Sequence, residues 1–153
     1  MDLVKKLKEL KLNLPNVSIP GGSYVSVNVR GSIAYVAIQF PIINQVYFYQ
    51  GRLGTEVSTE DGYKAMQLCA LNVLAQVQAK VGFEKVLGLN HIDACYQSSE
   101  EWDEGPNIVN GASDLFLKVL GEKGQHTRAI LGVHKLPRNF SVGLTASFTL
   151  NYK

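Results

Sequence analysis

One arginine stands out as a candidate ligand-binding group. Arg128 lies within the segment SDLFLKVLGEKGQHTRAILGVHKLP, residues 113–137. It follows a glycine-rich turn and precedes an apolar run that is typical of a buried strand. A guanidinium stays charged when it is partly buried, and it presents paired N–H groups to a carboxylate. Arg128 could therefore hold a small anion at a cleft, or it could pair with an acid on a neighbouring helix or loop.

The other residues that could do chemistry form no pattern that names a reaction. The histidines at positions 91, 126 and 134 are scattered along the chain, and structural or surface roles are the simplest interpretation of each. Cys69 falls inside a helical pattern and Cys95 inside a strand pattern, which predicts two buried, reduced thiols. Because no metal-ligand spacing or phosphate-binding loop is present, we expect no metal and no cofactor, and we assign no catalytic residue.

The elements that must position Arg128 follow from the hydrophobic periodicity. The pattern predicts a helix near the N-terminus, a hairpin at 24–30 and 33–40, a strand at 46–54, a long helix at 58–81, a strand at 86–96, a helix at 113–120, and strands at 128–136 and 140–150. Strands interleaved with helices in this way predict an α+β sandwich, with one antiparallel or mixed sheet and helices on one face. The second face of the sheet would then carry apolar groups such as Ile33, Tyr35 and Ile130. Burial against copies of the same chain would cover them, which predicts a homo-oligomer.

Length and composition limit the class of protein. The chain has 153 residues, of which 46% are hydrophobic and 18% charged, and we expect a single domain over residues 1–153. A net charge of +2 makes nucleic acid an unlikely partner, and no apolar run is long enough to span a bilayer. With no secretory signal and reduced thiols, we expect a cytoplasmic protein.

Four stretches of the sequence resemble the Rid family of reactive intermediate deaminases, also called the YjgF family. The segment TRAILGVHKLP is similar to the family signature ARxxVxVxxLP, and LPNVSIPGGSYVSVNVRGSIAYVAIQFP is similar to the family's opening strands. The long Ala/Leu helix with Asn72 also fits, and NGASDLFLKVLGEKGQHTR looks like the longer-chain branch. The resemblance covers about residues 12–150, with the four motifs in the family's order.

The resemblance implies a fold, an assembly and a site. The fold would be chorismate-mutase-like, of the bacillus type, with a mixed sheet and two helices on one face. Three copies would form a homotrimer whose sheets close into an inner β-barrel, with ligand clefts between subunits. In the family the strand arginine binds the carboxylate of a 2-imino acid, which is hydrolysed to a 2-keto acid and ammonia. Arg128 would take this role, Tyr24 would line the pocket from the first strand, and Asn110 would contribute a polar contact from the neighbouring subunit's loop.

The chain departs from the family pattern where water would be handled. Deaminases of the family carry a glutamate in the final strand, but this segment reads SVGLTASF and places Gly143 there, with Thr145 at a second acidic position. Ile130 stands where the family often has cysteine. Glycine can neither orient nor deprotonate water. If the chain is a deaminase, another group such as Tyr24, His126 or Glu122 must replace the glutamate.

Three functions are therefore open at this point. The first is hydrolysis of small 2-imino acids such as 2-iminopropanoate or 2-iminobutanoate. The second is binding of a small 2-imino or 2-keto carboxylate without catalysis, in the same cleft between subunits. The third and weakest is RNA cleavage, an activity attached to some family members, which the nearly neutral charge and the absence of a basic aromatic stripe disfavour.

Overall fold

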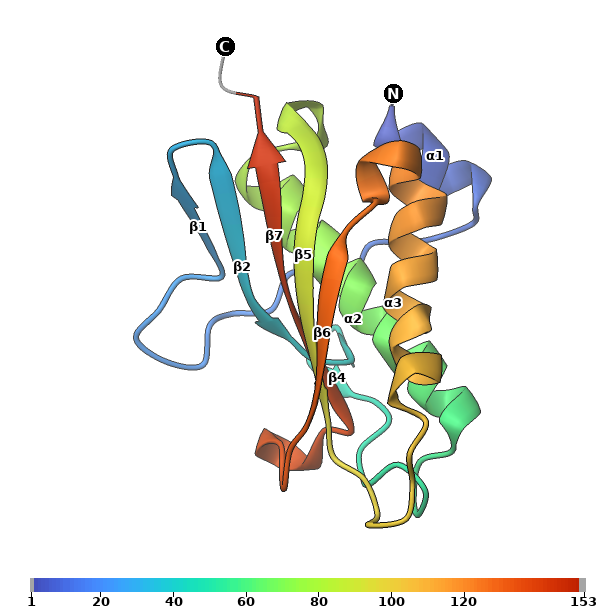
Figure 1. The fold of residues 1–153 in the computed structure, drawn as a ribbon. Helices are drawn as coiled ribbons and strands as arrows, with labels where there is room; N and C mark the ends of the chain where they lie inside the picture. The colour runs from blue at the N-terminus through green and yellow to red at the C-terminus, as the bar shows by residue number, and fades with distance from the viewer. Residues whose placement is uncertain (1, 152–153) are drawn as a thin grey trace.

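The computed structural model, which describes residues 2–151, has a five-stranded sheet in one layer and helices in the other (Figure 1). Across the sheet the strands are β1 (Val27–Arg30), β2 (Ile33–Gln39), β7 (Val142–Leu150), β5 (Val86–Tyr96) and β6 (Thr127–Gly132). Neighbouring strands are antiparallel except β5 and β6, which are parallel. The sheet is therefore mixed, and the predicted chorismate-mutase-like α+β fold is confirmed.

Three α-helices, three short 3₁₀ helices and a small hairpin complete the described chain. They are α1 (Leu3–Glu9), the hairpin of β3 (Ile42–Ile43) and β4 (Val46–Tyr47), α2 (Thr59–Lys80), η1 (Phe83–Lys85), α3 (Gly105–Leu120), η2 (Gly121–Gly124) and η3 (Pro137–Asn139). Helices α2 and α3 lie against the same face of the large sheet, as the sequence predicts (Figure 1). Among residues 2–151, no helix is both long and apolar enough to cross a membrane.

Helix α2 is the element that the sequence defines best. The Ser58 hydroxyl accepts a hydrogen bond from the backbone N–H of Asp61 at 3.1 Å, which caps the first turn of the helix. Met66, Val73 and Val77, spaced at helical intervals, are fully buried against the sheet. The cap and the apolar stripe together fix both the start of the helix and its buried face.

Helix α3 is eight residues longer at its start than the sequence predicts. It begins at Gly105 instead of Ser113, with Pro106 in its first turn. Proline is favourable there because the first backbone N–H groups of a helix need no partner within the helix. Glycine, proline and asparagine are typical of loops, so the sequence pattern alone hides this half of the helix.

The open face of the sheet is partly apolar, and one predicted member of it is wrong. Ala34 is buried in the core, so Ile33 and Tyr35 point to the open face, as expected. Ile130 instead faces the helices. Its register partner Ala94 lies in the core, and a Cβ added at Gly105 in α3 would lie only 3.3 Å from Ile130. Strand β6 lies at the edge of the sheet and pairs with β5 alone. The alternation of residues along such a strand does not show which of its two faces packs against α3.

We predict that Gly111→Ala destabilises the fold by about 1–3 kcal/mol, although alanine normally favours a helix. A Cβ at Gly111 of α3 would collide with the backbone carbonyl oxygen of Tyr63 in α2, and two packed helices would have to separate. Urea unfolding of the variant measures the loss. The comparison is Gly62→Ala in α2, where the new methyl group would lie 2.6 Å from Leu53 Cδ2 and 2.8 Å from Ile108 Cγ2, so the nearest obstacles are side-chain atoms and a smaller loss is expected. A Gly111→Ala protein as stable as the wild type would contradict this account of the helix contact.

Candidate functional site

Arg128 lies on the helix-facing side of the edge strand β6. Its register partner on β5 is Ile92, which is fully buried in the core. Because facing residues of paired strands point to the same side, the Arg128 side chain extends toward α3 and away from the open face of the sheet. The strand fixes the direction of the arginine, and the helix beside it supplies the arginine's partners.

The Arg128 guanidinium is held by neutral groups. Its Nη1 donates to Asn110 Oδ1 at 2.8 Å and to Ser113 Oγ at 3.1 Å, both on α3. No carboxylate of residues 2–151 lies within ion-pair distance of it. The alternative of an internal ion pair is therefore wrong for the described chain, and the positive charge has no counter-charge there.

The remaining donors of Arg128 match a carboxylate. Two hydrogen bonds engage both protons of Nη1, while Nε and Nη2 have no acceptor among the described residues. These two nitrogens form one edge of the planar guanidinium, and such an edge binds both oxygens of a carboxylate in a two-pronged way. Anchoring through Nη1 orients the group and leaves this edge available.

A histidine orders the groups behind Arg128. His126 Nδ1 lies 2.6 Å from the carbonyl oxygen of Gly124, which can only accept, so Nδ1 carries a proton. In the neutral ring Nε2 then accepts from the Ser113 hydroxyl at 2.8 Å, and the Ser113 oxygen accepts in turn from Arg128. His126 was considered as a replacement for the missing glutamate, and here it directs the hydroxyl that holds the arginine.

Asn110 contacts Arg128, but from a different place than expected. The resemblance implied a contact from the neighbouring subunit's loop, whereas Asn110 lies in the part of α3 that the sequence pattern missed, on the same chain as Arg128. Ser113 is a further partner that the sequence pattern does not single out, although its polar side chain at helical spacing from Asn110 is a signal for it.

Tyr24 lies at the other edge of the sheet. It sits in the bend before β1, which starts only at Val27, and its hydroxyl accepts from the backbone N–H of Gly21 at 3.1 Å. Tyr24 is about half exposed, at 52%, and lines a cleft of about 410 Å³ that Arg128 does not reach. Strands β2, β7 and β5 separate the β1 edge from the β6 edge. Within one chain, Tyr24 and Arg128 therefore do not form a common site.

Gly143 is the position at which the family resemblance implies a glutamate. It pairs with Cys95 on β5, on the open face of the sheet and thus on the opposite side from Arg128. A Cβ at this position would lie 2.7 Å from Ile38 Cδ1 and 3.0 Å from Phe40 Cε1. Both of these apolar side chains also line the Tyr24 cleft. The acid is missing, and hydrocarbon occupies the space that it would need.

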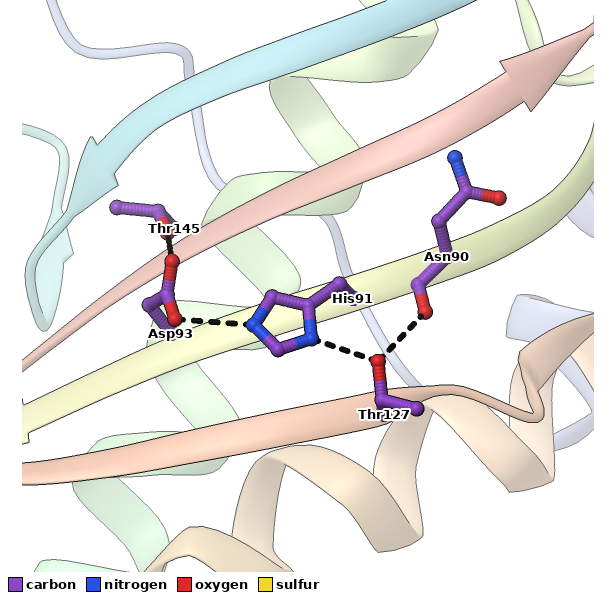
Figure 2. Close-up of polar contacts among 5 residues, drawn as sticks. All are labelled: Asn90, His91, Asp93, Thr127 and Thr145. Atoms are coloured by element: carbon purple, nitrogen blue, oxygen red, sulfur yellow. Dashed lines mark hydrogen bonds and ion pairs between the residues drawn. The ribbon is translucent and has the colours of Figure 1, made fainter.

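A polar network, shown in Figure 2, lies at the centre of the open face. His91 Nδ1 is 2.7 Å from Thr127 Oγ1 and His91 Nε2 is 3.0 Å from Asp93 Oδ1, while Thr145 donates to the other oxygen of Asp93 at 3.5 Å. The Thr127 hydroxyl also lies 3.4 Å from the carbonyl oxygen of Asn90. The network links β5 to both of its neighbours and includes the residue directly before Arg128. With side chains 40% and 54% exposed, the His91–Asp93 pair is accessible on the single chain.

Cys69 is a buried free thiol, as the sequence predicts, whereas the free thiol Cys95 is only partly buried. Burial raises the pKa of Cys69 well above its ordinary value. Burial also raises the pKa of Cys95, and the opposing effect of hydrogen bonding with the Gly143 backbone is smaller. Because the thiolate is the nucleophilic form, neither cysteine is suited to attack a ligand at neutral pH.

The family model described as "YjgF/chorismate_mutase-like, putative endoribonuclease" matches residues 5–149. Protein TCP17 of Trypanosoma cruzi is 34% identical over 147 residues, covering 95% of this chain and 92% of that protein. The crystal structure of Atu1372 from Agrobacterium tumefaciens, a protein of unknown function, has 33% identity and a TM-score of 0.90, covering 97% of this chain and 92% of that one. The E. coli TdcF structure with bound serine shares the fold at 18% identity and a TM-score of 0.56, covering 89% and 93% of the two chains.

We predict that Gly143→Glu lowers stability by about 1–3 kcal/mol, because the new side chain overlaps Ile38 and Phe40. The double variant Ile38→Ala/Gly143→Glu should recover part of this loss, since it removes the closest overlapping methyl group. Thermal unfolding of the two variants, with Ile38→Ala alone as the control, measures the difference. If the stability lost in the double variant equals or exceeds the sum of the losses in Gly143→Glu and Ile38→Ala, the Ile38 side chain does not occupy the space that the glutamate needs.

Proposed function

The chain belongs to the YjgF/chorismate-mutase-like (Rid) family, and on that premise we propose that it binds a small 2-oxo or 2-imino carboxylate through Arg128. The observation that carries the proposal is the guanidinium without a counter-charge, held by Asn110 and Ser113 with its Nε–Nη2 edge unengaged. A protein keeps a half-buried cation next to neutral partners at a cost in free energy, and an anionic ligand would offset that cost.

The family relationship favours a small carboxylate over other anions. TdcF holds serine in its crystal structure, and the α-carboxylate of an amino acid is the group that Arg128 would take here. A planar carboxylate fits the unengaged guanidinium edge with two parallel hydrogen bonds. With a net charge of +2 for the whole chain, RNA is a poorer candidate for the same site.

The complete site in this proposal forms between two copies of the chain. Tyr24 lies at the β1 edge and Arg128 at the β6 edge, so the two meet if the β6 edge of one copy approaches the β1 edge of the next. Such a head-to-tail contact gives a closed ring when its rotation closes, and the family resemblance implies a ring of three. Exposed apolar side chains on β6 and the open face, including Leu131 and Tyr35, would be covered in the ring.

We propose that the chain binds the carboxylate, and the residues of the cleft give less support to hydrolysis of a 2-imino acid. Among the described residues that line the Tyr24 cleft there is no Asp, Glu or His. Ile38 occupies the space of the family glutamate, so no carboxylate is placed there to activate water. The ligand would be held by its carboxylate without a nearby general base.

We predict that Arg128→Gln weakens pyruvate binding at least tenfold, because the charged edge is lost while similar bulk and polarity remain. Asn110→Asp should also weaken it, since the new carboxylate would sit about 2.8 Å from Nη1 and neutralise the arginine internally. Isothermal titration calorimetry of the folded variants measures both effects.

The control for this experiment is Lys64→Gln, which removes one exposed positive charge from α2, in the helix layer and outside both edge strands. Pyruvate binding that is equally strong in wild type and Arg128→Gln would refute the anchor. The same proteins, given 2-iminopropanoate formed in situ, should release pyruvate no faster than buffer does. Faster release that Arg128→Gln abolishes would instead show a hydrolase.

The arrangement between copies predicts complementation. Sedimentation should show the mass of three chains, and the variants Arg128→Gln and Tyr24→Ala should each bind pyruvate weakly. After mild denaturation and refolding together, some clefts would combine an intact Arg128 with an intact Tyr24 from another copy, so part of the binding should return. A monomer, or a mixture that binds no better than the two variants separately, would contradict a shared cleft.

A further inference from the structure

The Tyr24 cleft has a floor that is apolar and mainly aromatic. Phe40 and Phe140 stack with their ring centroids 4.6 Å apart and an interplanar angle of 10°. Tyr47 meets Phe140 edge-on at 4.9 Å and 65°. Together with Ile38 these rings line the cleft, whose volume of about 410 Å³ is within the range of sites for small organic ligands. The three carbons of pyruvate would leave most of this floor uncovered.

Two buried amide side chains in the cleft wall bind each other and the backbone. Gln39 and Gln76 are buried, and Gln76 Nε2 lies 3.4 Å from Gln39 Oε1 and 3.3 Å from the carbonyl oxygen of Ser18. Gln39 Nε2 donates to the carbonyl oxygen of Ala37 at 3.0 Å. Because these amides hold the wall together, they have few donors left for a polar ligand body.

Arg138 is the one charged residue among the described residues that line the cleft. Its guanidinium carbon lies 6.0 Å from the centroid of the Tyr47 ring, and no acid of residues 2–151 pairs with it. Its backbone adopts a left-handed conformation, with φ 54° and ψ 25°, and Gln50 donates to its carbonyl oxygen at 2.7 Å. A planar cation held above an aromatic ring forms a flat wall on which another apolar ring can stack.

We infer that the ligand is a carboxylate with a bulky apolar body, of the size of a leucine or phenylalanine side chain. The inference rests on the proposed function, because Arg128 of one copy would hold the carboxylate while the Tyr24 cleft of the next takes the body. Gly143 is part of the same arrangement. Without a side chain at this position, Ile38 and Phe40 can extend the apolar floor where an acid would make it polar. Tyr47 and Arg138 are then the residues that determine specificity.

The test compares 2-oxo acids that differ in the body alone. Calorimetry of the assembled protein with pyruvate, 4-methyl-2-oxopentanoate and phenylpyruvate should show at least tenfold tighter binding for the two larger acids, since each buried methylene adds to the affinity. Tyr47→Ala and Arg138→Gln should each remove most of the advantage of phenylpyruvate, measured as the ratio of the phenylpyruvate affinity to the pyruvate affinity of the same variant. Tyr47 is 39% exposed, so its truncation should leave the protein folded, and Lys64→Gln again controls for the loss of one positive charge.

The outcomes separate the two proposals. If phenylpyruvate binds no more tightly than pyruvate while Arg128→Gln abolishes both, the inference is overturned and the carboxylate anchor stands. If wild-type protein binds none of the three acids, or binds them independently of Arg128, the proposed function fails and this inference fails with it. An advantage of phenylpyruvate that survives both Tyr47→Ala and Arg138→Gln would overturn the assignment of these two residues.

Discussion

The candidate site depends on one interaction, the grip of two neutral α3 side chains on a single nitrogen of Arg128. Asn110 and Ser113 take both protons of Nη1, so the guanidinium cannot rotate freely, yet its charge is not cancelled. An acidic side chain in place of Asn110 or Ser113 would form an internal ion pair with Arg128 and cancel the charge that could bind an anion. Two features of the fold produce this contact. The pairing of β6 with β5 directs the Arg128 side chain toward α3. The start of α3 at Gly105 places Asn110 within reach of the guanidinium.

The second constraint is the packing around Gly143, where neighbouring side chains fill the space that a side chain at this position would take. In this chain the final strand has a residue without a side chain, and the space is filled from β2 by Ile38 and from the following turn by Phe40. A glutamate at this position would therefore require Ile38 and Phe40 to move. The surface that these two side chains form suits hydrocarbon better than an activated water molecule.

The sequence was sufficient for the elements whose periodicity is undisturbed. Alternation along residues 142–150 and the apolar stripe of α2 are properties of the local sequence, and both were predicted. The first half of α3 was hidden because Gly105, Pro106 and Asn107 have loop propensities that tertiary packing overrides. The facing of Ile130, the partners of Arg128 and the packing of Ile38 against Gly143 all join residues far apart in the chain. No local pattern records such contacts, so these could be seen only in three dimensions.

The two protected thiols have a consequence for the chemistry that the protein can tolerate. Compounds with C=N and C=O groups are electrophiles, and exposed thiolates add to them. Cys95 lies on the open face next to Gly143, where apolar surface is exposed, yet partial burial raises the pKa of its thiol, which donates to the Gly143 carbonyl oxygen. Cys69 is out of contact with solvent altogether. Burial thus lowers the fraction of both thiols in the reactive thiolate form, completely shielding Cys69 and partly shielding Cys95.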